Sequence, residues 1–359
     1  MPAIKRIEKV TDVRKKTTIK DIAKAADVSA TAVSMAMNNK PGVSQKTRRK
    51  IQKIAEKLQY SPNFIARSLI SNRSYTIGFI LNSITDPFFP ELAKGIEEYA
   101  NKQGYNLLLC NTKRDLQTEK KSIDMLRSKG VDGIILATVL KDDPNIVPLI
   151  EDEFPFVLIN RHSMNPDLKN KTSYVVLDNF RGGYMGMEHL YRLGHDRIAV
   201  ITGNVNTSTA ILRTEGSIKA LSDYGAKMDR ELIVEGRFQR QIAYEAAIKL
   251  IAMEAPPTAY FAQDDYMAIG IREALFEKGL RIPEDVALMG FDDTEIASFA
   301  GIDLTTISQN KYEMGAMGAK ILIEKIEKNS TGVVSQLILE SGLIIRKSCG
   351  YALQGAYSR

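Results

Sequence analysis

Residues 18–38 read TIKDIAKAADVSATAVSMAMN, and this stretch decides the architecture of the first part of the chain. Thr18 and Asp21 have the spacing of a capping box, in which a hydroxyl and a carboxylate satisfy the first free N–H groups of a helix. The apolar positions of that helix follow at helical spacing: Ile22, Ala23 and Ala26.

A second helix is predicted after a break of two residues. Ser29 is placed to cap a helix over Ala30–Asn38, because a serine hydroxyl accepts hydrogen bonds from the first free N–H groups. The small residues of this region allow two helices to cross closely, as in a helix-turn-helix that presents its second helix to the DNA major groove. Three side chains are expected to face the first helix: Ala32, Val33 and Met37.

A third helix is predicted to begin near Ser44, with an apolar stripe that includes Ile51 and Leu58 and basic residues on its other faces. Residues 1–76 carry 17 of the 49 Lys and Arg but only 5 of the 43 Asp and Glu, so their net charge is +12 and that of the remainder is −6. Such a charge suits either a solvated basic tail or a polyanion-binding module. The helical pattern favours the module.

The run from 18 to 38 and the following KPGVSQKTRRKIQKIAEKLQYSPNFIARSL at 40–69 closely resemble the DNA-binding head of the LacI/GalR family of bacterial repressors. The resemblance implies that Ala30, Thr31 and Met35 read base edges. It implies that four further residues contact or support the phosphate backbone: Thr18, Ser29, Ser34 and Asn38.

The head departs from the family at two of these base-reading positions. The family often has an arginine where Met35 stands and a longer polar side chain where Ala30 stands. The sequence therefore lacks the arginine-to-guanine contact that is the commonest direct readout. We expect more reliance on hydrogen bonding by Thr31, on thymine-methyl contacts and on DNA shape.

Residues 61–75 are interpreted as a hinge helix and linker, although taken alone they also suit a plain linker. The resemblance implies that paired hinges of a dimer fold on DNA and that Leu69 enters the minor groove between central base pairs. Asn63, Ala66 and Arg67 are expected to contact DNA beside it. Residues 1–16 are predicted to form a disordered basic extension.

After the hinge, continuous apolar runs alternate with amphipathic helical stretches, which indicates parallel sheets covered on both faces. The fold class is therefore a small all-α head followed by an α/β core of two doubly wound lobes, similar to the periplasmic sugar-binding fold that the family shares. We expect one lobe from 76–178 and 308–336 and the other from 179–307 and 337–359. The predicted strands are Thr76–Leu81, Asn106–Asn111, Gly133–Ala137, Phe156–Asn160, Tyr174–Asp178, Ile198–Gly203, Ala259–Gln263, Val286–Asp292 and Leu304–Ser308.

In open α/β lobes, ligands bind beyond the carboxyl ends of the strands. Polar or aromatic residues follow several predicted strands, although Phe88 and Phe89 also suit a core, and one of Asp264 and Asp265 is expected to cap a helix. The candidates at these ends are Phe88, Phe89, Asn160, Arg161, Asp264 and Asp292.

The resemblance adds Arg213, in LRTEG, as the effector-binding arginine, although a surface ion pair is its plain alternative. Thr207, Thr209 and Phe238 match other cleft positions. Carboxylates and guanidinium groups bind sugar hydroxyls, and aromatic faces cover apolar C–H patches.

These features predict a dimeric repressor that binds a pseudo-palindromic operator and responds to a small ligand, with a sugar favoured over a purine. A sugar-binding receptor without DNA binding is the weaker alternative, since it would need an export signal and no head. No apolar run reaches the ~20 residues that span a bilayer. We therefore expect a cytoplasmic location and no membrane partner. Nucleotide, hydrolase and metal motifs are absent from the sequence, so we expect neither an enzyme nor a cofactor.

Overall fold

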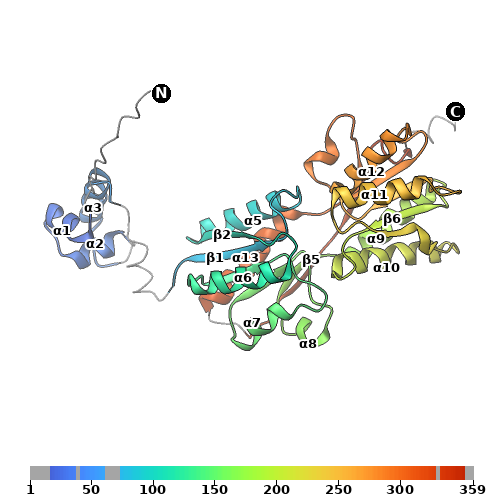
Figure 1. Ribbon diagram of the computed structural model, residues 1–359. Helices are drawn as coiled ribbons and strands as arrows, with labels where there is room; N and C mark the ends of the chain where they lie inside the picture. Colours follow the sequence, from blue (N-terminus) through green and yellow to red (C-terminus); the bar gives the residue numbers. More distant parts are fainter. Residues whose placement is uncertain (1–16, 38–40, 61–72, 329–331, 352–359) are drawn as a thin grey trace, which may run out of the picture. The chain divides into compact units, whose positions relative to one another are not determined.

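The computed structural model describes residues 17–37, 41–60, 73–328 and 332–351, and the chain divides into two compact units, Met1–Asn72 and Arg73–Arg359 (Figure 1). The predicted extension at 1–16, most of the hinge and the DNA contacts Asn38, Asn63, Ala66, Arg67 and Leu69 lie outside the described residues. Within those residues, no helix has the length and apolar character to cross a membrane.

The first unit contains three helices, α1 Ile19–Ala26, α2 Ala30–Met37 and α3 Gln45–Lys57. The capping box is confirmed, because Thr18 Oγ1 accepts from the Asp21 N–H and the Asp21 carboxylate accepts from the Thr18 N–H. Ser29 caps α2 as predicted, and Ser44 caps α3, which begins where the third helix was expected.

The core of this unit corrects one expectation. Val33 is fully buried, but its buried companion is Ala36, and Ala32 is only half-buried. Helix α2 has no charged residue, so its sequence does not mark which side faces the core. The other buried residues belong to α1 and α3, namely Ile22, Ala23, Ala26, Ile51 and Ala55.

Two basic side chains of α3 hold the carboxyl ends of the other helices. Arg48 Nη1 donates to the Ala36 carbonyl at 3.0 Å, and Lys50 Nζ donates to the Ala26 carbonyl at 2.8 Å. Cations at these ends satisfy free carbonyls and complement the helix dipole. These two charges therefore serve the fold of the head.

The second unit contains two six-stranded sheets, one in each lobe. The first sheet is fully parallel, in the order β11-β5-β4-β3-β1-β2, and Thr76 lies opposite Asn106 in its β1–β2 pair. Its strands are β1 Thr76–Leu81, β2 Asn106–Asn111, β3 Gly133–Leu136, β4 Phe156–Ile159, β5 Tyr174–Leu177 and β11 Gln336–Leu339. The helices of this lobe are α5 Phe89–Lys102, α6 Leu116–Ser128, η1 Pro144–Ile146, α7 Val147–Glu151, α8 Pro166–Lys169 and α13 Lys311–Lys328.

The second sheet has the order β12-β10-β9-β8-β6-β7, with only its β12 edge antiparallel. Its strands are β6 Ile198–Thr202, β7 Ile233–Glu235, β8 Ala259–Ala262, β9 Ala287–Asp292, β10 Thr305–Ser308 and β12 Gly342–Ile344. The helices of this lobe are α9 Asn179–Arg192, α10 Ser208–Asp223, η2 Arg230–Leu232, α11 Arg240–Ile251, α12 Asp265–Glu277 and η3 Glu295–Ser298.

The chain passes between the lobes after β5, after β10 and after β11. The third crossing was expected near Gln336, but β11 pairs along its whole length with β5, so the crossing comes after Leu339. This strand lies at the sheet edge, and Ile338 is 63% exposed. None of the residues of β11 is buried, and this strand was not predicted from the sequence.

Each lobe contains a pair of helices that touch backbone to backbone. A Cβ on Gly95 of α5 would lie 2.1 Å from the Tyr312 carbonyl oxygen of α13, and one on Gly183 of α9 would lie 2.1 Å from the Arg213 carbonyl oxygen of α10. Figure 1 shows α13 beside α5 although the two are far apart in the sequence. The absence of a side chain at these glycines sets the helix spacing.

We predict that Gly95→Ala lowers the free energy of unfolding by about 1–3 kcal/mol, because the new methyl group has to push α13 away from α5. Thermal and urea denaturation of the full chain measure this. Lys94→Ala, an exposed change on the same helix, should alter stability by less than about 0.5 kcal/mol. Equal stability of the two variants would contradict the close helix contact.

Candidate functional site

A cavity lies between the lobes, where the carboxyl ends of the parallel strands meet. Nine of the ten predicted ligand-binding residues line it, drawn from both lobes. The lining residues are Asn82, Asp86, Phe88, Phe89, Arg114, Asn160, Arg161, Thr209, Arg213, Phe238, Asp264 and Asp292.

Thr207 is the predicted residue that does not line the cavity. It is fully buried as the N-cap of α10, where Oγ1 donates to the Asn204 carbonyl at 2.7 Å and accepts from the Ala210 N–H at 3.4 Å. Its hydroxyl is used by the fold, and it orients the helix that carries Thr209 and Arg213.

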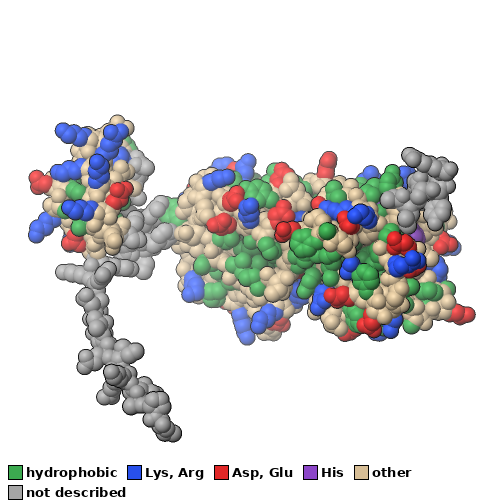
Figure 2. Space-filling model, turned by 90° about the horizontal axis from the view of Figure 1, so that it is seen from above, with side chains coloured by type: hydrophobic (Ala, Val, Ile, Leu, Met, Phe, Trp, Pro, Cys, Tyr) green, Lys and Arg blue, Asp and Glu red, His purple; other side chains and the backbone are tan. Residues whose placement is uncertain are grey.

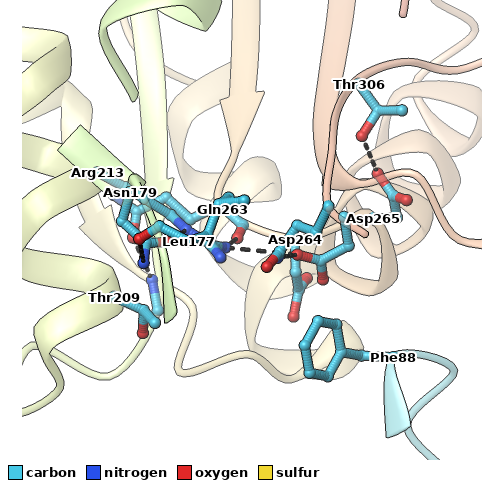
Figure 3. A network of polar contacts seen from close by, with 12 residues as sticks. Phe88, Leu177, Asn179, Thr209, Arg213, Gln263, Asp264, Asp265 and Thr306 are labelled. Atoms are coloured by element: carbon cyan, nitrogen blue, oxygen red, sulfur yellow. Dashed lines mark hydrogen bonds and ion pairs between the residues drawn. The ribbon is translucent and has the colours of Figure 1, made fainter. Parts of the chain in front are cut away.

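Arg213 is held from several sides. Nε donates to Asn179 Oδ1 at 2.8 Å, and Nη1 donates to the Gln263 carbonyl and lies 3.6 Å from Asp292 Oδ1 (Figure 3). The guanidinium carbon lies 3.5 Å from the centre of the Phe291 ring. The surface ion pair considered for Arg213 is therefore wrong, since this side chain is buried at the base of the cavity.

Asp264 and Asp265 make different contacts, and Asp264 is the one of the two that lines the cavity. Asp265 Oδ1 accepts from the Thr306 hydroxyl at 2.7 Å, and Oδ2 accepts from the Thr294 N–H at 2.7 Å, so it joins three segments of the second lobe. Asp264 accepts from the Met267 N–H at 2.6 Å as the cap of α12 and also faces the cavity. Figure 3 shows Phe88, from the first lobe, pointing toward these carboxylates.

Arg114 links the two lobes. Its Nη2 donates to Asp86 Oδ2 at 3.0 Å in its own lobe and to the Phe238 carbonyl of the other lobe at 2.6 Å. Arg114, Asn82 and Asp86 were not among the site residues predicted from the sequence. Arg114 lies in a loop that follows a largely exposed edge strand, so nothing local distinguishes it from the neighbouring surface cations.

Backbone strain is concentrated at this cavity. Four of its lining residues that are not glycine have left-handed φ values, namely Arg114 at 63°, Asn160 at 66°, Phe238 at 56° and Asp292 at 110°. Such conformations cost about 1–3 kcal/mol each and persist where the surrounding structure holds them. At this cavity they direct side chains from several loops into one space.

In the head, the exposed residues of α2 include Ala30 and Thr31 at its start, and Ser34 and Met35 are half-buried. Thr18 and Ser29 are engaged as caps, but both remain exposed. Basic side chains gather over the surface of this unit in Figure 2. The exposed ones are Lys20, Lys24, Lys46, Arg49, Lys50, Lys53 and Lys57.

Two family descriptions match the sequence, "Bacterial regulatory proteins, lacI family" over residues 18–63 and "Periplasmic binding proteins and sugar binding domain of LacI family" over residues 74–345. The chain belongs to the LacI family. It is thus a DNA-binding transcription regulator with a small head and a two-lobed ligand-binding core.

Relatives and solved structures agree with this assignment. The HTH-type transcriptional repressor PurR of Pasteurella multocida (strain Pm70) is 37% identical over 335 residues, which is 92% of this chain and 98% of the relative. The lac repressor dimer bound to operator and the anti-inducer ONPF is similar with a TM-score of 0.81 and 26% identity, over 93% of this chain and 99% of that one. The CelR–cellobiose complex is similar with a TM-score of 0.71 and 28% identity, over 93% and 100% of the two chains.

We predict that Arg114→Gln lets the lobes separate more readily, because the hydrogen bond from the first lobe to the Phe238 carbonyl is lost. The measurement is amide hydrogen exchange in the loop that carries Phe238, which should become faster in the unliganded variant. Arg127→Gln, which removes an arginine paired with Asp152 within the first lobe, should leave that exchange unchanged. Unaltered exchange in Arg114→Gln would exclude this link between the lobes.

The acid–base behaviour of Asp264 gives a second prediction. Burial, followed by the nearby Asp86 carboxylate, raises the pKa of Asp264 from 3.8 to about 7, although the Met267 N–H and Arg114 oppose the rise and Asp265 adds to it. Between pH 4 and pH 7 the folded chain therefore retains a proton that the unfolded chain has lost. This group thus lowers the free energy of unfolding progressively as pH rises through that window.

Asp264→Asn removes this effect and keeps a side-chain oxygen for the cap. We expect the melting temperature of the variant, relative to the parent, to rise by a few degrees between pH 5.5 and pH 8. Differential scanning calorimetry at both pH values measures it. A constant difference across this range would show that Asp264 is ionised throughout.

Proposed function

We propose that this LacI-family regulator is a homodimeric repressor whose operator affinity is controlled by a sugar-like effector in the cavity between its lobes. The observation that carries the proposal is the convergence of guanidinium, carboxylate and amide groups with Phe88 and Phe238 at that cavity. Such a lining offers bidentate partners to hydroxyls and faces to C–H patches. The complex of CelR with cellobiose supports the same ligand class.

The cavity is connected to the chain crossings through Asp292. Its carboxylate accepts from Gln309 Nε2, and its carbonyl accepts from Lys311 Nζ at 2.6 Å, both just after β10 where the chain returns to the first lobe. Asn179, which bonds Arg213, begins α9 immediately after the first crossing. An effector that binds Arg213 and Asp292 therefore acts on the segments that set the angle between the lobes.

A change in that angle alters the population of the conformer that binds DNA. An effector that favours this conformer acts as a corepressor, and one that favours the other acts as an inducer. In the head, we propose that Thr31, Ala30 and Met35 read base edges from the major groove, supported by Thr18, Ser29 and Ser34. Two heads are needed because one short head makes too few contacts for specific binding.

A purine effector is the second candidate, and the PurR relatives favour it. The Phe88 and Phe238 rings could cover a flat base, with Arg213 and Asp292 at its edge. We prefer the sugar class because the lining is dominated by charged and amide groups, whereas a purine needs two broad apolar faces.

The test begins with selection of genomic fragments by the purified full chain at about 150 mM salt, where screening suppresses purely electrostatic binding. The selection is repeated with a pool of sugars and with a pool of purines. Enrichment of one palindrome, changed by one pool and not by the other, supports the repressor and identifies the effector class. Absence of enrichment under all three conditions would contradict the proposal.

We predict that Arg213→Gln weakens effector binding about 10- to 100-fold, because it removes a charged hydrogen-bond donor from a buried site. The effector identified above should then no longer change operator affinity at a concentration that saturates the parent. Isothermal titration and fluorescence anisotropy measure the two quantities. Arg197→Gln, which removes a half-exposed arginine paired with Asp229 outside the cavity, serves as the control. Normal effector response in Arg213→Gln would remove this residue from the site.

We predict that Thr31→Val weakens binding to the selected operator about 10-fold, because the hydroxyl is lost while the shape is kept. Its affinity for random DNA should stay unchanged, since that affinity comes from phosphate contacts. Lys53→Gln removes an exposed charge on α3 and tests a phosphate contact instead of a base contact. It should weaken binding to the selected operator and to random DNA by the same factor. Equal loss on both DNAs in Thr31→Val would contradict a base-reading role.

A further inference from the structure

Arg161 is a buried cation that makes no direct ion pair in the part of the chain that the structure describes, although Asp86 and Glu119 act on it at longer range. The residue is only 8% exposed, its Nε atom is buried without a hydrogen-bond partner, and its guanidinium makes no ion pair with any described carboxylate. The guanidinium carbon lies 5.3 Å from the centre of the Phe238 ring. Buried charges in proteins are normally paired and hydrogen-bonded.

The other cations at the cavity do have such partners. Arg213 lies 3.6 Å from Asp292, and Arg114 lies 3.0 Å from Asp86. Arg161 therefore leaves a positive charge that the lining does not balance. Burial, then Arg114 and Arg213, lower the pKa of Arg161 to about 10 although Asp86 and Glu119 oppose the fall, so Arg161 is still charged at neutral pH.

Little solvent fits beside Arg161 in the cavity between the lobes. The cavity has a volume of about 30 Å³, which holds only one or two water molecules on the scale of about 10–15 Å³ each. Arg161 and Arg114 also line a neighbouring cavity of about 380 Å³, whose other walls come from both lobes. An arginine at the junction of two cavities is accessible to a ligand that extends through both.

The carboxylates of the cavity do not cancel this positive charge. Asp292 pairs with Arg213, and Asp86 pairs directly with Arg114 while it attracts Arg161 only at longer range, so one carboxylate serves two guanidinium groups. Glu119 also attracts Arg161, but the pKa of Glu119 is raised to about 7, so its charge is incomplete near neutral pH. Asp264 is protonated in a large fraction of molecules near neutral pH, because its pKa is raised to about 7, and in that form it donates a hydrogen bond instead of repelling an anion.

We propose that the effector is an acid, a small polyhydroxylated compound whose carboxylate or phosphate group binds the Arg161 guanidinium. The inference rests on the proposed function, since it concerns the same cavity. A guanidinium takes either group through two parallel N–H donors, which matches the unused donors of Arg161. The hydroxyl groups of the ligand would then face Asp292, Asp264 and Asn160.

The experiment uses the full chain and matched pairs of acidic and neutral compounds. The pairs are galacturonate with galactose, gluconate with glucitol, and glucose 6-phosphate with glucose, measured by isothermal titration at constant ionic strength. We expect the acid of at least one pair to bind 10-fold or more tightly than its neutral partner. The carboxylate pairs and the phosphate pair separate the two sources of negative charge.

Substitutions then test the residue. Arg161→Gln should weaken binding of the preferred acid about 10- to 100-fold and bring its affinity close to that of the neutral partner, while Arg161→Lys should recover part of the difference. Arg127→Gln removes a positive charge from the same lobe outside the cavity and should leave the preference intact. In the unliganded chain, Arg161→Gln should raise the melting temperature, because it removes an unpaired buried charge.

The proposal is overturned if no acid binds, if neutral partners bind as tightly as the acids, or if Arg161→Gln keeps the preference for the acid. Its failure is distinct from failure of the proposed function. A neutral sugar that changes operator affinity would leave the proposed function standing and remove the acid. An acid that binds through Arg161 without changing operator affinity would support the acid site and contradict the proposed function.

Discussion

The core depends on one buried carboxylate at the end of β9. Asp292 pairs with Arg213 of α10, accepts from Gln309, and through its carbonyl binds Lys311 at the start of α13. Lys311 Nζ lies 3.2 Å from Glu91 Oε2 of α5 in the first lobe. A single residue thus connects the ligand cavity, the second crossing and the first helix of the opposite lobe. Burial raises the pKa of this carboxyl well above 3.8, and Arg213 opposes that rise.

Much of the fold follows from local sequence patterns. The caps at Thr18 and Ser29 and the nine predicted strands could be predicted because their signals lie within a few residues of one another. Strands β7, β11 and β12 could not, since none of them has a fully buried residue and each is recognised only by its pairing with a distant strand. The buried face of α2 was misjudged for a similar reason, because no charge marks its outer side.

The cavity was predictable where its residues end strands and not where they lie in loops. Asn160, Arg161, Asp264 and Asp292 stand at or directly after predicted strands, and parallel topology brings such positions together. Arg114 reaches the cavity from a loop beyond an exposed edge strand, through two consecutive residues with left-handed φ. Burial of Arg161 without a partner is a property of the whole lining, so no short window of sequence contains it.

The position of α13 has a consequence for synthesis of the chain. Residues 311–339 supply a covering helix and an edge strand to the first lobe, yet they follow nearly all of the second lobe in the sequence. During translation, the sheet face of the first lobe that α5 and α13 share is therefore only partly covered until the second lobe has been made, at about 5–20 residues per second. Met314, Ala319 and Leu322 close that face last. A nonsense codon just before Lys311 would consequently remove a covering helix and an edge strand from the lobe made first, whereas most of the lobe made second would still be translated.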